Sequence, residues 1–214
     1  MPTRRLALIA ALAPIVALAL GLAPWAPAAA ATKAKPAKLA AAPGDMSLGS
    51  PRAKVQVVEY ASLSCPHCAK FNNEVFPAFK AKYVDSGQVR YTLREMLTPP
   101  AEVAAAGFML ARCAGPAKYF TVVDQVFKSQ PQWADGKIKP IFVQIAKDNG
   151  LDEARFDACL NNKEGLAALR SRVAAAVAAG VNSTPTFLIN GKTYQGELTM
   201  EQLDAAIAEA KKGG

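Results

Sequence analysis

The sequence contains no internal repeat, no nucleic-acid recognition motif and no second pair of closely spaced cysteines. Because its lysines are scattered, the net charge of +8 indicates a solvated basic surface and argues against a nucleic-acid partner. A tetrahedral zinc site needs four ligands, which usually come as two closely spaced pairs, and only one such pair is present. A length of 214 residues suits one domain with an insertion and argues against several independent domains.

Residues 1–31 have the pattern of a secretory signal peptide. Arg4 and Arg5 precede an apolar run over residues 6–22, and small residues with Ala-x-Ala spacing follow. An uncleaved membrane anchor is the alternative, because the run approaches the length that spans a bilayer, although a proline and a glycine interrupt it. The arginine pair also leaves twin-arginine export open. We expect cleavage and a periplasmic location, with an Ala/Lys/Pro-rich flexible leader over residues 32–45.

Alternating and β-branched residues predict the first elements of the domain. A strand is expected over residues 53–60, followed by a helix that Ser64 caps, that Pro77 kinks and that ends near Val84. A second strand is expected over residues 88–96. Ala-rich amphipathic segments then predict a block of helices over residues 98–112, 118–128, 140–147, 152–160 and 165–179.

The last part of the sequence returns to a β pattern. Asn190-Gly191 between two extended runs predicts a hairpin, since this dipeptide favours a tight turn between antiparallel strands. Thr199 and Gln202 have the spacing of a capping box and predict the start of a final helix.

The segment SLSCPHCAKF, residues 62–71, places Cys65 and Cys68 where the first strand meets the following helix. Unsatisfied backbone N–H groups and the positive end of the helix dipole converge there, and both favour a thiolate over a thiol. His67 adds to this effect if its ring faces the sulfur and carries a proton; otherwise it is an ordinary polar residue. A lowered thiol pKa makes a cysteine reactive, and it makes the disulfide oxidising because the reduced form is stabilised.

Other roles remain open for the four cysteines. A zinc site would need Cys113 and Cys159 as its remaining ligands, but these lie far apart on separate predicted helices. A purely structural Cys65–Cys68 bridge would close too little chain to stabilise the fold much. For Cys113 and Cys159 we expect a structural disulfide, whose long loop would stabilise the fold by about 4 kcal/mol. A second redox centre is the alternative there, without a helix start or a charge to activate it.

Glu59 and Pro185 are ambiguous from the residues alone. Glu59 is either a half-buried carboxylate with a raised pKa that shuttles protons for Cys68, or a solvent-facing strand residue. Pro185 is either a cis proline at a strand entrance, which would expose the backbone of Thr184 to an extended substrate, or an ordinary trans loop proline.

Two stretches, VVEYASLSCPHC and GVNSTPTFLINGK, resemble the DsbA-like family of exported thiol:disulfide oxidoreductases. The similarity extends from about Met46 to Lys212, and CPHC combined with a downstream Thr-Pro before a strand is a specific signal. The resemblance implies an α/β, thioredoxin-like fold with an inserted all-helical domain. We accordingly expect thioredoxin-fold parts over residues 46–97 and 180–214, and the helical insertion over residues 98–179.

The resemblance also implies roles for single residues. These are the exposed nucleophile Cys65, its buried partner Cys68, the tuning residues Pro66 and His67, the buried acid Glu59, and the substrate-binding pair Thr184 and Pro185, with a cis bond before the proline. It implies no metal and no organic cofactor. The implied activity is oxidation of reduced, folding exported proteins, with a membrane quinone reductase regenerating the disulfide.

Two departures from the family pattern bear on the direction of the reaction. Strong oxidants of the family often carry Val before the cis-proline, whereas the Thr184 found here is commoner among isomerases. Isomerases of this type usually oligomerise through an N-terminal domain, whereas only the short leader precedes this fold, so we expect a monomeric oxidase. An isomerase or reductase with the same cysteines and a peptide-binding chaperone are the alternatives.

Overall fold

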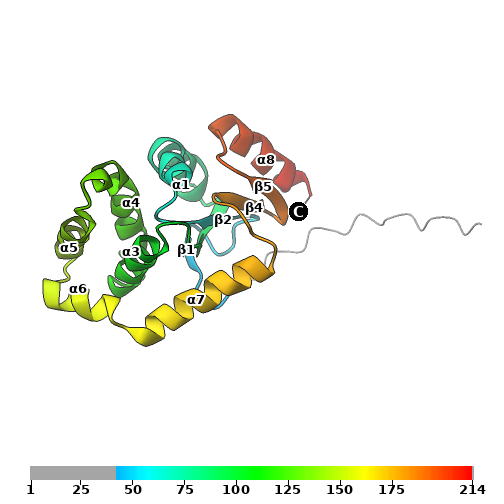
Figure 1. Ribbon diagram of the computed structural model, residues 1–214. Helices are drawn as coiled ribbons and strands as arrows, with labels where there is room; N and C mark the ends of the chain where they lie inside the picture. Colours follow the sequence, from blue (N-terminus) through cyan, green and yellow to red (C-terminus); the bar gives the residue numbers. More distant parts are fainter. Residues whose placement is uncertain (1–41, 214) are drawn as a thin grey trace, which may run out of the picture. The chain divides into compact units, whose positions relative to one another are not determined.

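The computed structural model describes residues 42–213 (Figure 1). The predicted signal peptide and most of the predicted leader lie outside the described residues. Within residues 42–213, no helix has both the length and the hydropathy that crossing a membrane requires.

A five-stranded mixed sheet forms the centre of the fold, in the order β1-β3-β2-β4-β5. Its strands are β1 (Met46–Leu48), β2 (Val55–Ala61), β3 (Val89–Glu95), β4 (Thr186–Ile189) and β5 (Lys192–Gln195). Only β2 and β3 run parallel, and the other neighbouring pairs are antiparallel. The strands predicted from β-branched residues are therefore confirmed. The short strand β1 was not predicted, because three residues are too few to show a periodic pattern.

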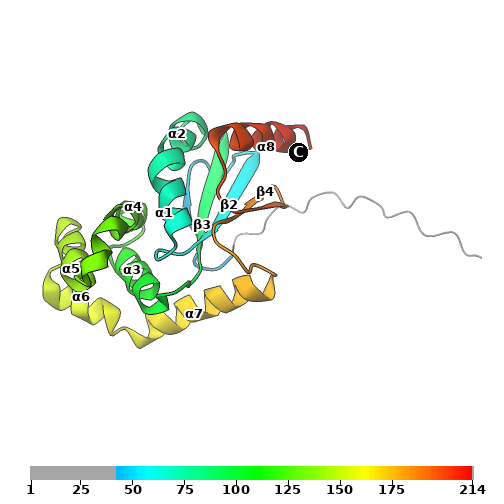
Figure 2. The ribbon, with the colours of Figure 1, turned by 45° about the horizontal axis from the view of Figure 1, so that its top comes forward.

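The two faces of the sheet are covered by different helices, as Figures 1 and 2 show. On β2, Val55, Val57 and Ala61 belong to the large core shared with the first and last helices, whereas Val58 and Tyr60 belong to a smaller cluster on the other face. That smaller cluster includes a residue of the long helix α7 (Lys163–Ala178). The central strand is buried on both faces because it alternates between these two cores.

The helical stretch that follows β2 alternates between α-helical and π-helical segments. It consists of α1 (Pro66–Lys70), a π-helical turn η1 (Phe71–Val75), α2 (Phe76–Phe79) and a second π-helical turn η2 (Lys80–Val84). The first π turn ends two residues before Pro77, which has no N–H to donate. At the end of this turn, the N–H of Phe76 bonds to the carbonyl of Phe71.

The predicted cap of this helix at Ser64 is wrong. The N-cap is Cys65, whose sulfur accepts a hydrogen bond from the N–H of Cys68. The hydroxyl of Ser64 is instead 2.7 Å from the carbonyl oxygen of Thr98, to which it donates. The serine thus ties the start of the helix to the loop after β3, and the cap position belongs to a cysteine.

The predicted block of helices lies between β3 and β4 in the sequence. Its members are α3 (Ala101–Cys113), α4 (Tyr119–Ser129), α5 (Ile138–Asp148), α6 (Glu153–Leu160) and α7, and a 3-10 turn η3 (Gln130–Asp135) joins α4 to α5. The five predicted helices are confirmed, with ends that differ by a few residues. Together with the sheet, this block gives the thioredoxin-like fold with a helical insertion that the resemblance implies.

A buried carboxylate joins this block to the sheet. Glu95, at the end of β3, has a side chain that is 1% exposed, and it accepts hydrogen bonds from Arg112 of α3 and Arg172 of α7, each at 2.5 Å. The hydroxyl of Tyr119 on α4 also donates to it, at 3.3 Å. A buried charge is stable only when it is paired, so these contacts fix three helices against the sheet edge.

The C-terminal part contains the predicted hairpin and capped helix. Asn190 and Gly191 both have positive φ angles, as the tight turn between β4 and β5 requires. The final helix α8 (Met200–Lys212) begins with a capping box in which Thr199 and Gln202 each bond to the backbone of the other. This helix packs against β2 and β4 on the same face as α1 and α2 (Figure 2).

Candidate active site

Cys65 lies at the junction of β2 and α1, where the chain changes from extended to helical. Its backbone is extended, and its sulfur accepts a hydrogen bond from the N–H of Cys68 at 3.4 Å. Both cysteines are free thiols. Cys65 is 5% exposed and Cys68 is fully buried, so the nucleophile is more enclosed than the resemblance predicts, although it is the more accessible sulfur of the two.

The surroundings of Cys65 favour its thiolate. Its pKa is lowered from 9.0 to about 5, chiefly by hydrogen bonding from the side chain of Cys68. The side chain of Thr184 and the backbone N–H groups of Cys68 and His67 lower this pKa further, and burial opposes them. The first N–H groups of a helix lack intrahelical partners, so the sulfur at the N-cap takes up donors that would otherwise be unsatisfied.

Cys68 has the opposite character. Its pKa is raised well above the ordinary value for cysteine, because burial penalises the thiolate and because Cys65 and the charge of Glu59 disfavour it further. The two sulfurs thus differ in both access and acidity. In the reduced form the negative charge resides on Cys65, and Cys68 stays protonated.

Glu59 points into the core beneath this pair. The residue is 2% exposed, so the solvent-facing interpretation is wrong and the buried one is right. Its pKa is raised from 4.5 to about 8; burial is the largest cause, a hydrogen bond from Tyr91 opposes it, and the charge of Cys65 adds to it. A carboxyl group with this pKa can both give and take a proton near neutral pH.

The loop before β4 lies beside the sulfur of Cys65. The sulfur of Cys65 lies 3.5 Å from the backbone carbonyl oxygen of Thr184, to which only the protonated thiol can donate, and the Thr184–Pro185 peptide bond is cis. The N–H of Gly196 donates to the carbonyl of Pro185 at 2.9 Å and so joins this loop to the turn after β5. The structure therefore places Thr184 beside Cys65, and contact of this loop with a substrate stays a prediction.

Pro66 and His67 occupy the first turn of α1 and are both exposed. Pro66 fits there because the first helical position needs no N–H donor. The ring of His67 does not bond to the sulfur in the described part of the chain. Its Nδ1 lies 2.5 Å from Oε1 of Glu197, in the turn between β5 and α8. The backbone N–H of His67 is the part of this residue that contacts the Cys65 sulfur and lowers its pKa.

Three residues of the site were not found from the sequence. Gln130, in η3, donates from its side chain to the carbonyls of Leu63 and Cys65 at 2.8 and 3.2 Å. Tyr91 bonds to Glu59, and Glu197 bonds to His67. Each lies far from its partner in the sequence, and no local pattern indicates such a pairing. An acidic residue directly after a glycine in the last turn was the only available signal for Glu197.

The other two cysteines are joined to each other. Cys113 at the end of α3 and Cys159 in α6 form a disulfide within the helical insertion. A zinc site that uses all four cysteines would require both of these sulfurs as thiolates. Among residues 42–213, no group of three or more His, Cys, Asp or Glu side chains could hold a metal ion.

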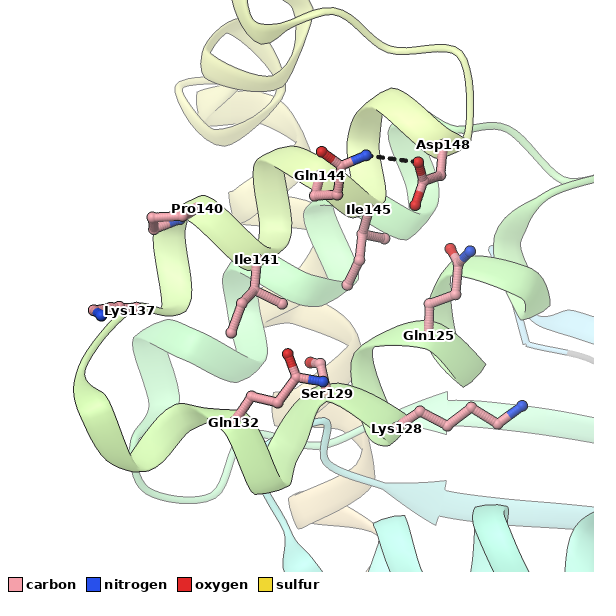
Figure 3. A pocket seen from close by; sticks show the side chains of 10 residues that line it. All are labelled: Gln125, Lys128, Ser129, Gln132, Lys137, Pro140, Ile141, Gln144, Ile145 and Asp148. Carbon is pink, nitrogen blue, oxygen red and sulfur yellow. Dashed lines mark hydrogen bonds between the residues drawn. The ribbon is translucent and has the colours of Figure 1, made fainter.

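A cleft of about 610 Å³ lies away from the redox pair, between α4, η3 and α5 (Figure 3). Ile141 and Ile145 point from α5 toward Ser129 and Gln132 on the opposite wall, and Gln144 bonds to Asp148 at its edge. Its lining contains no cysteine and no histidine. The cleft is therefore not part of the cysteine pair, although its wall includes Ser129, the residue next to Gln130.

Comparison with known proteins supports the chemistry of this site. The family model described as thioredoxin matches residues 41–209. A protein named protein-disulfide oxidoreductase from Rickettsia conorii is 32% identical over 169 residues, which cover 78% of this chain and 60% of that protein. This chain spans about three fifths of the length of its Rickettsia relatives. The disulfide bond formation protein D of Bacillus subtilis is 23% identical over 194 residues, which cover 79% of this chain and 78% of that protein.

Solved structures show the same fold. The crystal structure of α-DsbA1 from Wolbachia pipientis is similar with a TM-score of 0.75 and 26% sequence identity. The match covers 84% of this chain and 97% of that one. The chain therefore has the fold of this DsbA protein, and its sequence is similar to that of proteins named protein-disulfide oxidoreductases.

Proposed function

This chain belongs to the DsbA-like family of thioredoxin-fold disulfide oxidoreductases, and we propose that it is an exported oxidase that donates a Cys65–Cys68 disulfide to reduced proteins. The observation that carries the proposal is the contrast between the two sulfurs. The pKa of Cys65 is lowered to about 5, whereas that of Cys68 is raised. A thiolate that is stabilised in the reduced protein makes the disulfide a better oxidant, by roughly 30 mV for each pKa unit.

The reaction consists of two exchanges. A substrate thiolate attacks the sulfur of Cys65 in the oxidised protein, the Cys65–Cys68 bond breaks, and Cys68 leaves and takes up a proton. A second thiolate of the substrate then attacks the substrate sulfur of the mixed disulfide and releases Cys65 as a thiolate. The substrate loses two electrons and gains a disulfide, and the protein gains the two electrons as a dithiol.

Glu59 has the properties needed to supply the proton in the first exchange. Cys68 is a poor leaving group as a thiolate, because its pKa is raised by burial. With its own pKa near 8, Glu59 is mostly protonated at neutral pH, and in its ionised form it disfavours the thiolate of Cys68. We assign Glu59 the role of a general acid for Cys68 in this direction and of a general base in the reverse direction.

The proposed substrates and the proposed reoxidising partner follow from the same proposal. Substrates are reduced, folding exported proteins. An extended segment of such a protein would bind to the backbone of Thr184 beside Cys65. Reoxidation of the dithiol falls to a membrane quinone reductase, as in the family. Export depends on the signal peptide predicted over residues 1–31, and we propose that the mature protein acts as a monomer in the periplasm.

The ability to oxidise is tested by refolding of reduced ribonuclease. The oxidised wild-type protein is expected to restore ribonuclease activity, and a Cys65→Ala variant is expected to restore none. Undiminished refolding by the variant would support a peptide-binding chaperone and overturn the redox assignment. A Cys113→Ala/Cys159→Ala variant serves as the matched control, because it removes two cysteines without touching the pair at α1.

An isomerase or reductase with the same cysteines is the second candidate, and Thr184 before the proline favours it. The resting redox state of Cys65 and Cys68 in cells separates the two functions. An oxidase is held mainly as the disulfide, so a thiol-specific reagent should leave the pair unmodified. A pair that is mainly modified would support the isomerase or reductase.

A further inference from the structure

Glu197 lies in the turn between β5 and α8 and faces two cations of α1. Its Oε1 is 2.5 Å from Nδ1 of His67, and its Oε2 is 2.9 Å from Nζ of Lys70. His67 lies between the two cysteines in the sequence, so this carboxylate contacts the dipeptide that separates the reactive sulfurs. The side chain of Glu197 is 26% exposed, whereas those of His67 and Lys70 are 68% and 57% exposed.

The backbone around Glu197 is fixed on both sides. The preceding residue, Gly196, donates its N–H to the carbonyl of Pro185 in the loop beside Cys65. Two residues after Glu197, Thr199 begins the capping box of α8. The segment that carries Glu197 is therefore anchored by hydrogen bonds on both sides and places the carboxylate opposite α1.

We propose that Glu197 is a positioning residue for the redox pair, which holds the ring of His67 and the amine of Lys70 and so limits the positive charge available to the Cys65 thiolate. The inference rests on the proposed function, in which Cys65 is the sulfur that carries charge in the reduced protein. It accounts for the absence of the His67 ring from the hydrogen bonds that surround the sulfur in the described residues.

The direction of the effect follows from the charges. The pKa of Glu197 is lowered by Lys70 first and by His67 second, so the carboxylate is ionised in the pH range where Cys65 titrates, near 5. When the carboxylate becomes a neutral amide, Lys70 loses its counter-charge and the ring of His67 is free to turn toward the sulfur, so the thiolate gains stability.

The experiment compares wild type with Glu197→Gln in equilibrium with glutathione. In this reaction the oxidised protein and two glutathione molecules give the dithiol protein and one glutathione disulfide. We expect the equilibrium constant to rise about two- to fivefold, the range of exposed ion pairs, with a matching fall in the pH at which the Cys65 thiol ionises. A constant that is unchanged or lower in Glu197→Gln overturns the inference.

Glu209→Gln is the matched control. Glu209 also pairs with an exposed lysine, Lys192, but that pair joins the start of β5 to α8 and not to α1. The Glu209→Gln substitution removes the same charge as Glu197→Gln and is expected to leave the equilibrium constant with glutathione unchanged. An equal shift in Glu209→Gln would mean that net charge, and not the position of Glu197, determines the effect.

A variant background separates positioning from direct repulsion. In a His67→Ala/Lys70→Ala protein, the additional Glu197→Gln substitution is expected to change the equilibrium constant by less than about 1.5-fold, since the groups that it holds are gone. A full two- to fivefold change in that background overturns the inference. Failure of the proposed function is distinct, because the wild-type thiol itself would then titrate as an ordinary cysteine.

Discussion

The hydroxyl of Tyr91 donates a hydrogen bond to Oε2 of Glu59 at 2.6 Å inside the core. The two residues lie on the adjacent parallel strands β3 and β2 and on the same face, with Glu59 two residues beyond Val57, the residue that pairs with Tyr91. This bond favours the charged carboxylate, but burial outweighs it, and the pKa of Glu59 remains raised to about 8. The fold thus carries an acid that is unstable in its charged form, directly beneath the cysteine pair.

Replacement of Glu59 by Gln should stabilise the protein in a pH-dependent way. Because the folded-state pKa is raised from 4.5 to about 8, the folded protein binds more protons than the unfolded chain between these values. Wild-type stability should therefore fall as pH rises through this window, and Glu59→Gln should not show this loss. At about 1.4 kcal/mol per pKa unit, we expect a gain that approaches about 5 kcal/mol above pH 8 and is absent below pH 4.5.

Urea denaturation of the reduced proteins across this pH range measures the difference. Glu74→Gln is the control, because Glu74 is an exposed residue of η1, and its pH profile should follow that of wild type. If Glu59→Gln were as stable as wild type, or less stable, at the alkaline end, Glu59 would not be a carboxyl group with a raised pKa.

Gln130→Ala should loosen the loop that carries Cys65. The substitution removes two hydrogen bonds and leaves the carbonyls of Leu63 and Cys65 without this donor. We expect a loss of about 1–3 kcal/mol in the free energy of unfolding, measured by chemical denaturation. Gln132→Ala, at an exposed position of the same turn, should cost less than about 0.5 kcal/mol. Equal losses in the two variants would show that Gln130 is not a support for the loop.

Removal of the Cys113–Cys159 disulfide should affect stability and leave the exchange reaction intact. The bridge spans 46 residues, and restricting a loop of that length in the unfolded chain stabilises the fold by about 4 kcal/mol. We expect Cys113→Ala/Cys159→Ala to lose about 2–4 kcal/mol in denaturation under oxidising conditions and to keep its rate of ribonuclease oxidation at temperatures where it is folded. A large loss of that rate in the folded variant would indicate that the second pair takes part in electron transfer.

Periodicity and turn chemistry were sufficient to predict most elements of the fold. The strands at residues 53–60 and 88–96, the five helices of the insertion, the Asn190–Gly191 turn and the Thr199 capping box depend on local rules, and all are present. The predicted cap at Ser64 was wrong, because the hydroxyl of Ser64 donates to the nearby carbonyl of Thr98. The π-helical turns and β1 have no local signature that would distinguish them from a regular helix or a loop.

The candidate site could be predicted only in part, for a similar reason. The cysteines share one segment, so their place at a helix start could be inferred. The burial of Glu59 is decided by tertiary packing, since the same strand pattern fits either face. The contacts of Gln130 and Glu197 join segments that meet only in the folded chain. The division into thioredoxin-fold parts at residues 46–97 and 180–214 and a helical insertion at residues 98–179 stays a prediction.

The measurement that bears most directly on the account is the ionisation of Cys65, followed by the ultraviolet absorbance of its thiolate as the reduced protein is titrated. The account predicts a midpoint near the lowered pKa of about 5, and no such transition in a Cys65→Ser variant, because Cys68 stays protonated throughout. A midpoint of about 8.5, as for an ordinary cysteine, would contradict it.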